Sequence, residues 1–77
     1  MPTMAKIAFY GKLAERLGRE VELDLPTEGC TIAALRARFE GVDRATVRAF
    51  VNDETVREDH VVRPDDRVDF LPPLSGG

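Results

Sequence analysis

The sequence predicts a two-layer α+β domain in which one β-sheet packs against one main helix. Residues 21–25 and 47–51 alternate apolar and polar side chains, a pattern typical of half-buried strands. The segment between them carries one apolar stripe with helical spacing, made of Ile32, Leu35 and Phe39. Because one helical stripe covers only one face of a single sheet, the other face is predicted to stay open.

The elements follow from local signals along the chain. The segments predicted as strands are residues 5–10, 21–25, 47–51, 54–56 and 67–71. A short helix of good helix formers is predicted at 12–17, with Gly18 as its cap. The main helix begins after Thr31, a typical N-cap residue, and is expected to end at Gly41. By analogy with known folds, this order favours a β-grasp arrangement, with the first and last strands adjacent and parallel in one mixed sheet.

The composition is that of a single globular domain spanning residues 1–77. A chain of 77 residues and 8.6 kDa leaves no room for a second core. Apolar residues make up 43% and charged residues 32%, a mixture that argues against a disordered chain. The net charge is −3 and the pI is near 5.0, so no nucleic-acid partner is expected.

Neither a membrane nor a metal ion is expected as a partner. No apolar run approaches the roughly 18 to 20 residues that cross a bilayer, and residues 1–4 do not begin a secretory signal. One cysteine, Cys30, and one histidine, His60, cannot by themselves build an internal disulfide or a metal cluster. The expected setting is therefore a reducing cytoplasm.

Alternation along the strands predicts an apolar group on the open face of the sheet. If Val68 and Phe70 face the main helix, Leu71 faces away, and the same rule turns Tyr10 and Phe50 outward. An exposed apolar group of this kind is typical of a surface that binds a protein partner. The alternative is that a loop folds over these residues.

The tail at residues 72–77 has its own chemistry. Its residues are Pro72, Pro73, Leu74, Ser75, Gly76 and Gly77. The two prolines stiffen its base, and the two glycines make a flexible end narrow enough for a channel only as wide as a backbone. Six extended residues reach about 20 Å, enough to enter a neighbour's active site. If ATP activates the terminal carboxylate, a sulfur nucleophile can convert it to a thiocarboxylate, and an amine can convert it to an amide.

The ending Phe-Leu-Pro-Pro-Leu-Ser-Gly-Gly at residues 70–77 resembles that of the MoaD/ThiS family of sulfur carriers. Among these carriers it is most similar to those that act as the small subunit of molybdopterin synthase. The resemblance covers essentially the whole chain, including the end of the first strand at Tyr10 and the turn at residues 64–66. The family is similar in fold to ubiquitin, which agrees with the β-grasp prediction.

The resemblance implies a function for the chain end. An E1-like adenylyltransferase would use ATP to activate Gly77, and a sulfur donor system would convert it to a thiocarboxylate. The tail would enter the large catalytic subunit of molybdopterin synthase, in a heterotetramer, and donate sulfur for molybdenum cofactor biosynthesis. The chain itself would be no enzyme and would bind no cofactor, because ATP belongs to the activating enzyme. Tyr10 and Leu71 match contact positions of the family.

Other functions stay open at this point. The same fold and tail suit a sulfur carrier for thiamine, cysteine or tRNA thiolation. They also suit a ubiquitin-like modifier that joins Gly77 to a lysine amine, or a binding module whose tail is inactive. Cys30 is expected to be a packing residue and His60 a solvated one. The arginines that form a solvated face or meet an acidic partner are Arg36, Arg38, Arg44 and Arg48.

Overall fold

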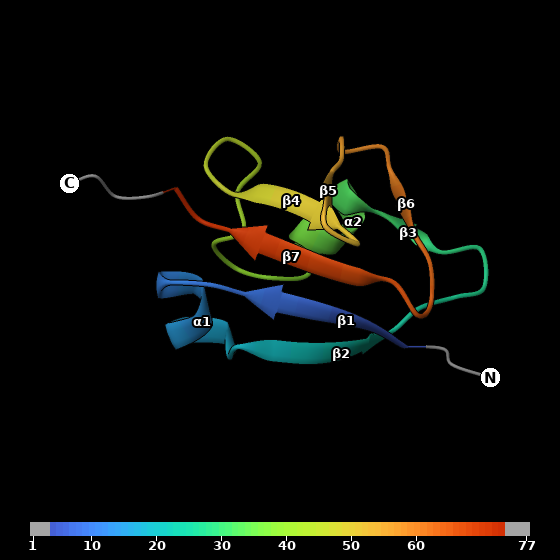
Figure 1. Cartoon of the computed structure of the whole chain (residues 1–77), viewed down its shortest axis with the longest axis horizontal. Helices are drawn as coiled ribbons and strands as arrows, with labels where there is room; N and C mark the ends of the chain where they lie inside the picture. The colour runs from blue at the N-terminus through green and yellow to red at the C-terminus, as the bar shows by residue number, and fades with distance from the viewer. Residues whose placement is uncertain (1–3, 74–77) are drawn as a thin grey trace.

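The computed structural model describes residues 4–73, which form two β-sheets and two short helices (Figure 1). The main sheet contains β1 (Met4–Phe9), β2 (Glu20–Asp24), β4 (Arg48–Val51), β5 (Glu54–Thr55) and β7 (Arg67–Leu71). The second sheet pairs β3 (Cys30–Thr31) with β6 (Val61–Val62), and the helices are α1 (Lys12–Leu17) and α2 (Ile32–Ala37). Within this part of the chain, neither helix is long and apolar enough to span a membrane.

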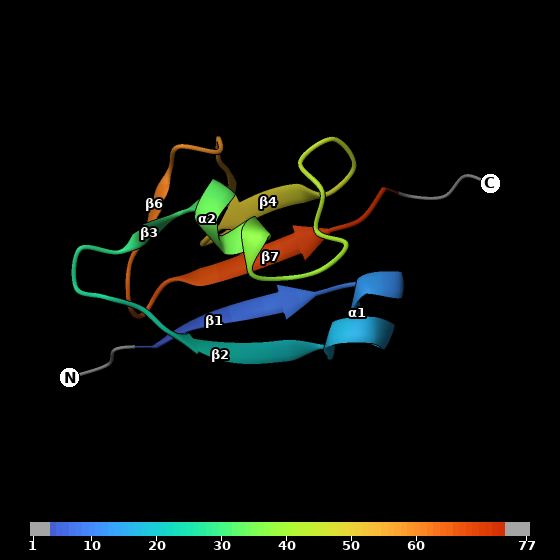
Figure 2. The same cartoon turned by 180° about the vertical axis from the view of Figure 1, so that it is seen from behind.

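The main sheet has the strand order β2-β1-β7-β4-β5, so the first and last strands of the chain lie side by side at its centre. β1 and β7 run parallel, with Ile7 beside Val68 and Phe9 beside Phe70. Their outer neighbours, β2 and β4, run antiparallel to them. α2 covers one face of this sheet, as Figure 2 shows with the helix in front of the strands. The predicted β-grasp arrangement is therefore confirmed.

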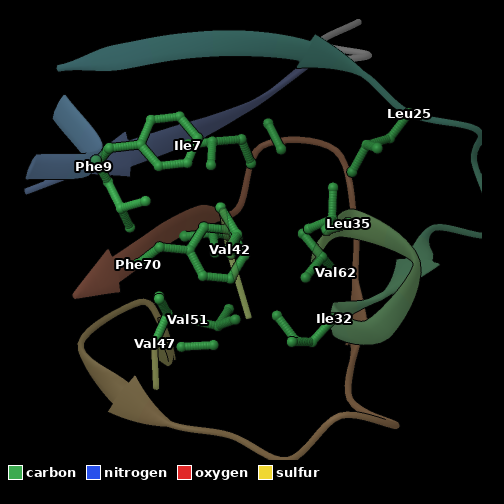
Figure 3. Close-up of a cluster of buried hydrophobic side chains, with 14 residues drawn as sticks. Ile7, Phe9, Leu25, Ile32, Leu35, Val42, Val47, Val51, Val62 and Phe70 are labelled. Atoms are coloured by element: carbon green, nitrogen blue, oxygen red, sulfur yellow. The ribbon is translucent and has the colours of Figure 1, made fainter. Parts of the chain in front are cut away.

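The core fills the space between the central strands and α2. Its largest buried side chains from these elements are Val68 and the residues labelled in Figure 3 as Ile7, Phe9, Phe70, Ile32 and Leu35. The Phe9 ring stacks on the Phe70 ring, with their centroids 6.0 Å apart. Burying a side chain of this size contributes about 1.5–3 kcal/mol, so these side chains together stabilise the packing of α2 on the sheet.

α2 is shorter than the sequence predicts, because it ends at Ala37 rather than at Gly41. The backbone N–H of Phe39 donates to the carbonyl of Arg36 at 3.1 Å, which tightens the chain after the last helical turn. Phe39 then packs edge-on against the Phe9 ring, with their centroids 5.0 Å apart. The apolar stripe correctly predicts that Phe39 packs on the core, but not that it does so from outside the helix.

The start of α2 follows the prediction, since the Thr31 hydroxyl oxygen accepts the backbone N–H of Ala34 at 3.1 Å. The sequence does not predict β3 and β6, which pair Cys30 with Val62 and Thr31 with Val61. Strands of two residues are too short to show an alternating pattern. β1 also begins and ends one residue before the predicted segment, so Tyr10 lies just beyond it.

Arg36 is only 8% exposed, so the prediction that it belongs to a solvated face is wrong. Its Nε lies 2.8 and 3.0 Å from the two carboxylate oxygens of Glu58. Its Nη1 donates to the carbonyls of Val47 at 2.6 Å and Asp43 at 3.1 Å. These bonds satisfy a buried charge and tie α2 to the loop before β4. The sequence does indicate this burial, because Arg36 follows the buried Ile32 by four residues and so lies on the same helical face.

Candidate partner-binding face and tail base

The face of the main sheet opposite α2, which we call the open face, carries the three apolar residues predicted to bind a partner. Figure 1 looks onto this face. Tyr10 is 42% exposed and Leu71 is 38% exposed, whereas Phe50 is half-buried. No loop within residues 4–73 covers Tyr10 or Leu71, so the alternative of a covering loop is not observed for the described chain.

The strand register brings these three residues into one region of the open face. The parallel pairing of β1 and β7 extends to Phe9 and Phe70, the residues immediately before Tyr10 and Leu71. On β4, Phe50 lies two residues beyond the position opposite Leu71, and therefore on the same face. The group lies at the end of β7 from which the tail departs (Figure 1).

A polar network fixes the Tyr10 side chain on this face. The Tyr10 hydroxyl donates to Oδ1 of Asp69 at 3.0 Å. Asp69 is only 7% exposed, and the same oxygen lies 3.3 Å from Nε of Arg67, whose Nη1 contacts Glu20 at 3.1 Å. The side-chain hydrogen bond with Tyr10, and after it the Asp69 carboxylate, raises the pKa of Arg67. Alternation predicts Asp69 on the outer face but not its burial.

The base of the tail lies against Gly11, which is not among the predicted site residues. A Cβ added at Gly11 would lie 3.2 Å from Cγ of Pro72, and the φ of Gly11 is +60°. The positive φ favours glycine at this position, and a Cβ here would also make a tight contact with the Pro72 ring. The remaining predicted tail residues, Leu74, Ser75, Gly76 and Gly77, lie outside the described residues, so their roles stay predictions.

Cys30, His60 and the turn at residues 64–66 form no catalytic arrangement with one another in the described chain. Burial raises the pKa of the Cys30 thiol, and the nearby charge of Arg38 only partly opposes this effect. The half-buried Cys30 packs against the core, as predicted, and its raised pKa disfavours the thiolate. His60 is exposed, and Asp66 accepts the backbone N–H of Arg63 at 2.9 Å within the predicted turn. Residues 4–73 contain no group of three or more His, Cys, Asp or Glu side chains that could hold a metal ion.

The sequence matches the family described as the ThiS family over residues 7–77. The chain belongs to this family of small, ubiquitin-like sulfur carriers. The resemblance to MoaD/ThiS carriers noted in the sequence is thereby confirmed. A comparison with curated protein sequences gives no significant match.

Solved structures support the ubiquitin-like β-grasp fold of this ThiS family member. SAMP1 from Haloferax volcanii, a small archaeal modifier protein, has a TM-score of 0.75 at 20% identity, over 96% of this chain and 99% of its own. A putative molybdopterin converting factor subunit 1 from Pyrococcus furiosus has a TM-score of 0.72 at 25% identity, over 94% and 99%. Subunit 1 in a complex with subunit 2 of the molybdopterin-converting factor from Helicobacter pylori has a TM-score of 0.65 at 20% identity, over 96% and 99%.

Proposed function

We propose that this ThiS family carrier is the small, sulfur-carrying subunit of a molybdopterin synthase. The observation that carries the proposal is the Phe-Leu-Pro-Pro-Leu-Ser-Gly-Gly ending, which starts on the central strand β7 and leaves the sheet at Pro72. The structural likeness to the Pyrococcus furiosus protein, at 25% identity, supports the same pathway. The reactive group is then the carboxylate of Gly77, and the folded domain presents it to other proteins in the cytoplasm.

The chemistry at Gly77 proceeds in two substitutions. A carboxylate oxygen attacks the α-phosphorus of ATP, pyrophosphate leaves, and a mixed anhydride with AMP forms on an E1-like adenylyltransferase. A sulfur nucleophile from a donor system then attacks the carbonyl carbon, and AMP leaves. When the nucleophile is a persulfide, the product is an acyl disulfide. A thiol of the donor system then attacks the donor's own sulfur atom, so that the S–S bond breaks, a disulfide forms within the donor system and the thiocarboxylate leaves. This chain needs no cofactor of its own for these steps, because ATP is bound by the activating enzyme.

The open face supplies the docking surface for the partners. Tyr10, Phe50 and Leu71 lie close to the tail base, so a protein that binds them is positioned to receive the tail. The two prolines of the base, and the tail residues Leu74, Ser75 and Gly76, would line the approach to its active site. The known complex of the two Helicobacter pylori subunits supports a large catalytic subunit as the acceptor partner. A heterotetramer is the assembly that we expect.

A second function is favoured by a specific observation, the likeness to a small archaeal modifier protein. In that case an amine of a target lysine, and not a sulfur nucleophile, would displace AMP and form an amide with Gly77. Sulfur carriers for thiamine, cysteine or tRNA thiolation would differ from the main proposal only in the acceptor. Chemistry at Gly77 separates the modifier from the carriers, and the acceptor separates the carriers from each other.

Intact-protein mass spectrometry tests the proposal. The full chain is incubated with an E1-like activating enzyme, ATP and a sulfur donor, and a chain lacking Gly77 is the control. We expect one oxygen to be replaced by one sulfur in the full chain alone, and the product to convert a pyranopterin substrate when the large subunit is added. No mass change, with an activating enzyme shown to act on another carrier, would reject sulfur carriage. Thiocarboxylate formation without pyranopterin conversion would reject the molybdopterin pathway only.

A further inference from the structure

A groove of about 920 Å³ lies beside the tail base, between the loop that precedes β4 and the end of β7. Its apolar lining includes Phe50, Leu71 and Pro72. Its charged lining includes Arg44, on the loop, and Arg48, at the start of β4. Figures 1 and 2 both place this loop and the end of β7 at the same end of the molecule. The groove therefore joins the open face to the point where the tail departs.

The two arginines at the groove are exposed and lack an acidic partner among residues 4–73. The described ion pairs of arginines involve Arg16, Arg36 and Arg67, and not Arg44 or Arg48. Arg36, which also lines the groove, is already neutralised by Glu58 and bonded to two backbone carbonyls. Arg44 also shares a second surface hollow with Glu58 and Asp59, whereas no acidic residue lines the groove itself. The groove thus offers two guanidinium groups without ion pairs among residues 4–73 next to an apolar surface, although the whole chain carries a net charge of −3.

The groove lies where a protein that receives the tail would contact this chain. A protein that takes the tail into its active site has to approach over Pro72 and Pro73, which line the groove. Arg44 and Arg48 are then brought against the surface of that protein, beside the apolar contacts of Phe50 and Leu71. Guanidinium groups pair well with carboxylates because two parallel N–H donors match two oxygens.

We propose that this groove is a recognition site for an acidic segment of the E1-like activating enzyme. The segment would place carboxylates on Arg44 and Arg48 and an apolar side chain against Phe50 and Leu71. The two arginines would then orient a carrier that is acidic overall, so that its tail points into the adenylation site. This inference rests on the proposed function only in requiring that Gly77 is adenylated, and it holds for each of the sulfur acceptors named above.

The rate of ATP–pyrophosphate exchange, measured against the concentration of the carrier, tests this site. The variants Arg44→Glu and Arg48→Glu are compared with Arg63→Glu, a matched charge reversal of an exposed residue that does not line the groove. We expect KM for the carrier to rise about tenfold in the groove variants with kcat unchanged, and to change less than about twofold in Arg63→Glu. Arg48→Lys should recover part of the loss. The difference between Arg48→Glu and wild type should shrink at high salt, because exposed charges are screened.

The outcomes separate the inference from the proposed function. Equal KM values for the groove variants and Arg63→Glu, with the wild-type chain adenylated, would overturn the inference and leave the sulfur-carrier function standing. A wild-type chain that an otherwise competent activating enzyme does not adenylate would overturn both. Circular dichroism and thermal unfolding of each variant show whether the fold is intact. A KM increase in folded groove variants that persists unchanged at high salt would also overturn the electrostatic role.

Discussion

The two faces of β7 are held by different kinds of interaction. On the inner face, Val68 and Phe70 are completely buried against the core. On the outer face, Arg67 and Asp69 are held by ion pairs and by the Tyr10 hydroxyl, and Leu71 remains 38% exposed beside the tail base. One face is therefore stabilised by apolar burial and the other by directional polar contacts.

Within the five residues of β7, those that stabilise the fold are therefore different from those available to bind a partner. Because side chains alternate along a strand, neighbouring residues of β7 belong to different surfaces. Substitutions at Val68 and Phe70 should unfold the domain, whereas substitutions at Leu71 should leave the fold intact and weaken the partner complex. The predictions that follow test this separation, beginning with the largest expected effect.

Phe70→Ala should lower the free energy of unfolding by about 3–5 kcal/mol, because it leaves a cavity beside the Phe9 ring. Leu71→Ala, one residue further along, should cost less than about 1 kcal/mol because its side chain is already partly solvated. Urea unfolding followed by circular dichroism measures both values. Equal losses for the two variants would show that the outer face also contributes to the core.

Arg36→Leu should lower the free energy of unfolding by about 3 kcal/mol, because it leaves the Glu58 carboxylate and two loop carbonyls without their donor. Arg38→Leu is the matched control, because Arg38 is exposed and should change stability by less than about 0.5 kcal/mol. Chemical unfolding gives both differences. A stable Arg36→Leu variant would mean that the loop before β4 does not depend on these bonds.

Gly11→Ala should cost about 1–2 kcal/mol, because it combines a positive φ with a crowded approach to Pro72. Gly18→Ala is the matched control, since its φ is also positive at +96° but no atom lies within 4 Å of the added Cβ. Thermal unfolding measures the loss of stability in both variants. Gly11→Ala should in addition slow adenylation of the chain end, and equal adenylation rates in the two variants would argue against a role of Gly11 in seating the tail.

The sequence predicts the architecture correctly where a pattern of neighbouring residues shows which side chains are buried. Alternation assigned Phe50 and Leu71 to the open face correctly, because the strand period of two residues is the same in any sheet. Such a pattern does not predict that α2 ends at Ala37. Phe39, beyond that end, packs against Phe9, a contact between residues thirty positions apart that no local pattern reports.

The polar interactions of the candidate site were harder to predict. The partners Tyr10 and Asp69 are 59 positions apart, and only the pairing of β1 with β7 brings them together. Because arginine is seldom buried, the composition of α2 predicts a solvated Arg36, although its position four residues after Ile32 indicates the buried face. The roles of Gly76 and Gly77 rest on family resemblance and chemistry, and they stay predictions.

Tyr10→Phe should lower the free energy of unfolding by about 1 kcal/mol, because Asp69 loses a hydrogen bond while its ion pair with Arg67 remains. Asp69→Asn should cost a similar amount or more, and the double variant should cost less than the sum of both. A double-mutant cycle measures the coupling, for which we expect about 1 kcal/mol. Because the aromatic ring is retained in Tyr10→Phe, its affinity for the large subunit should fall only a few-fold, whereas Tyr10→Asp should abolish binding without unfolding the domain. Zero coupling would mean that the polar network does not orient Tyr10, and the open face would then owe its partner affinity to apolar contact alone.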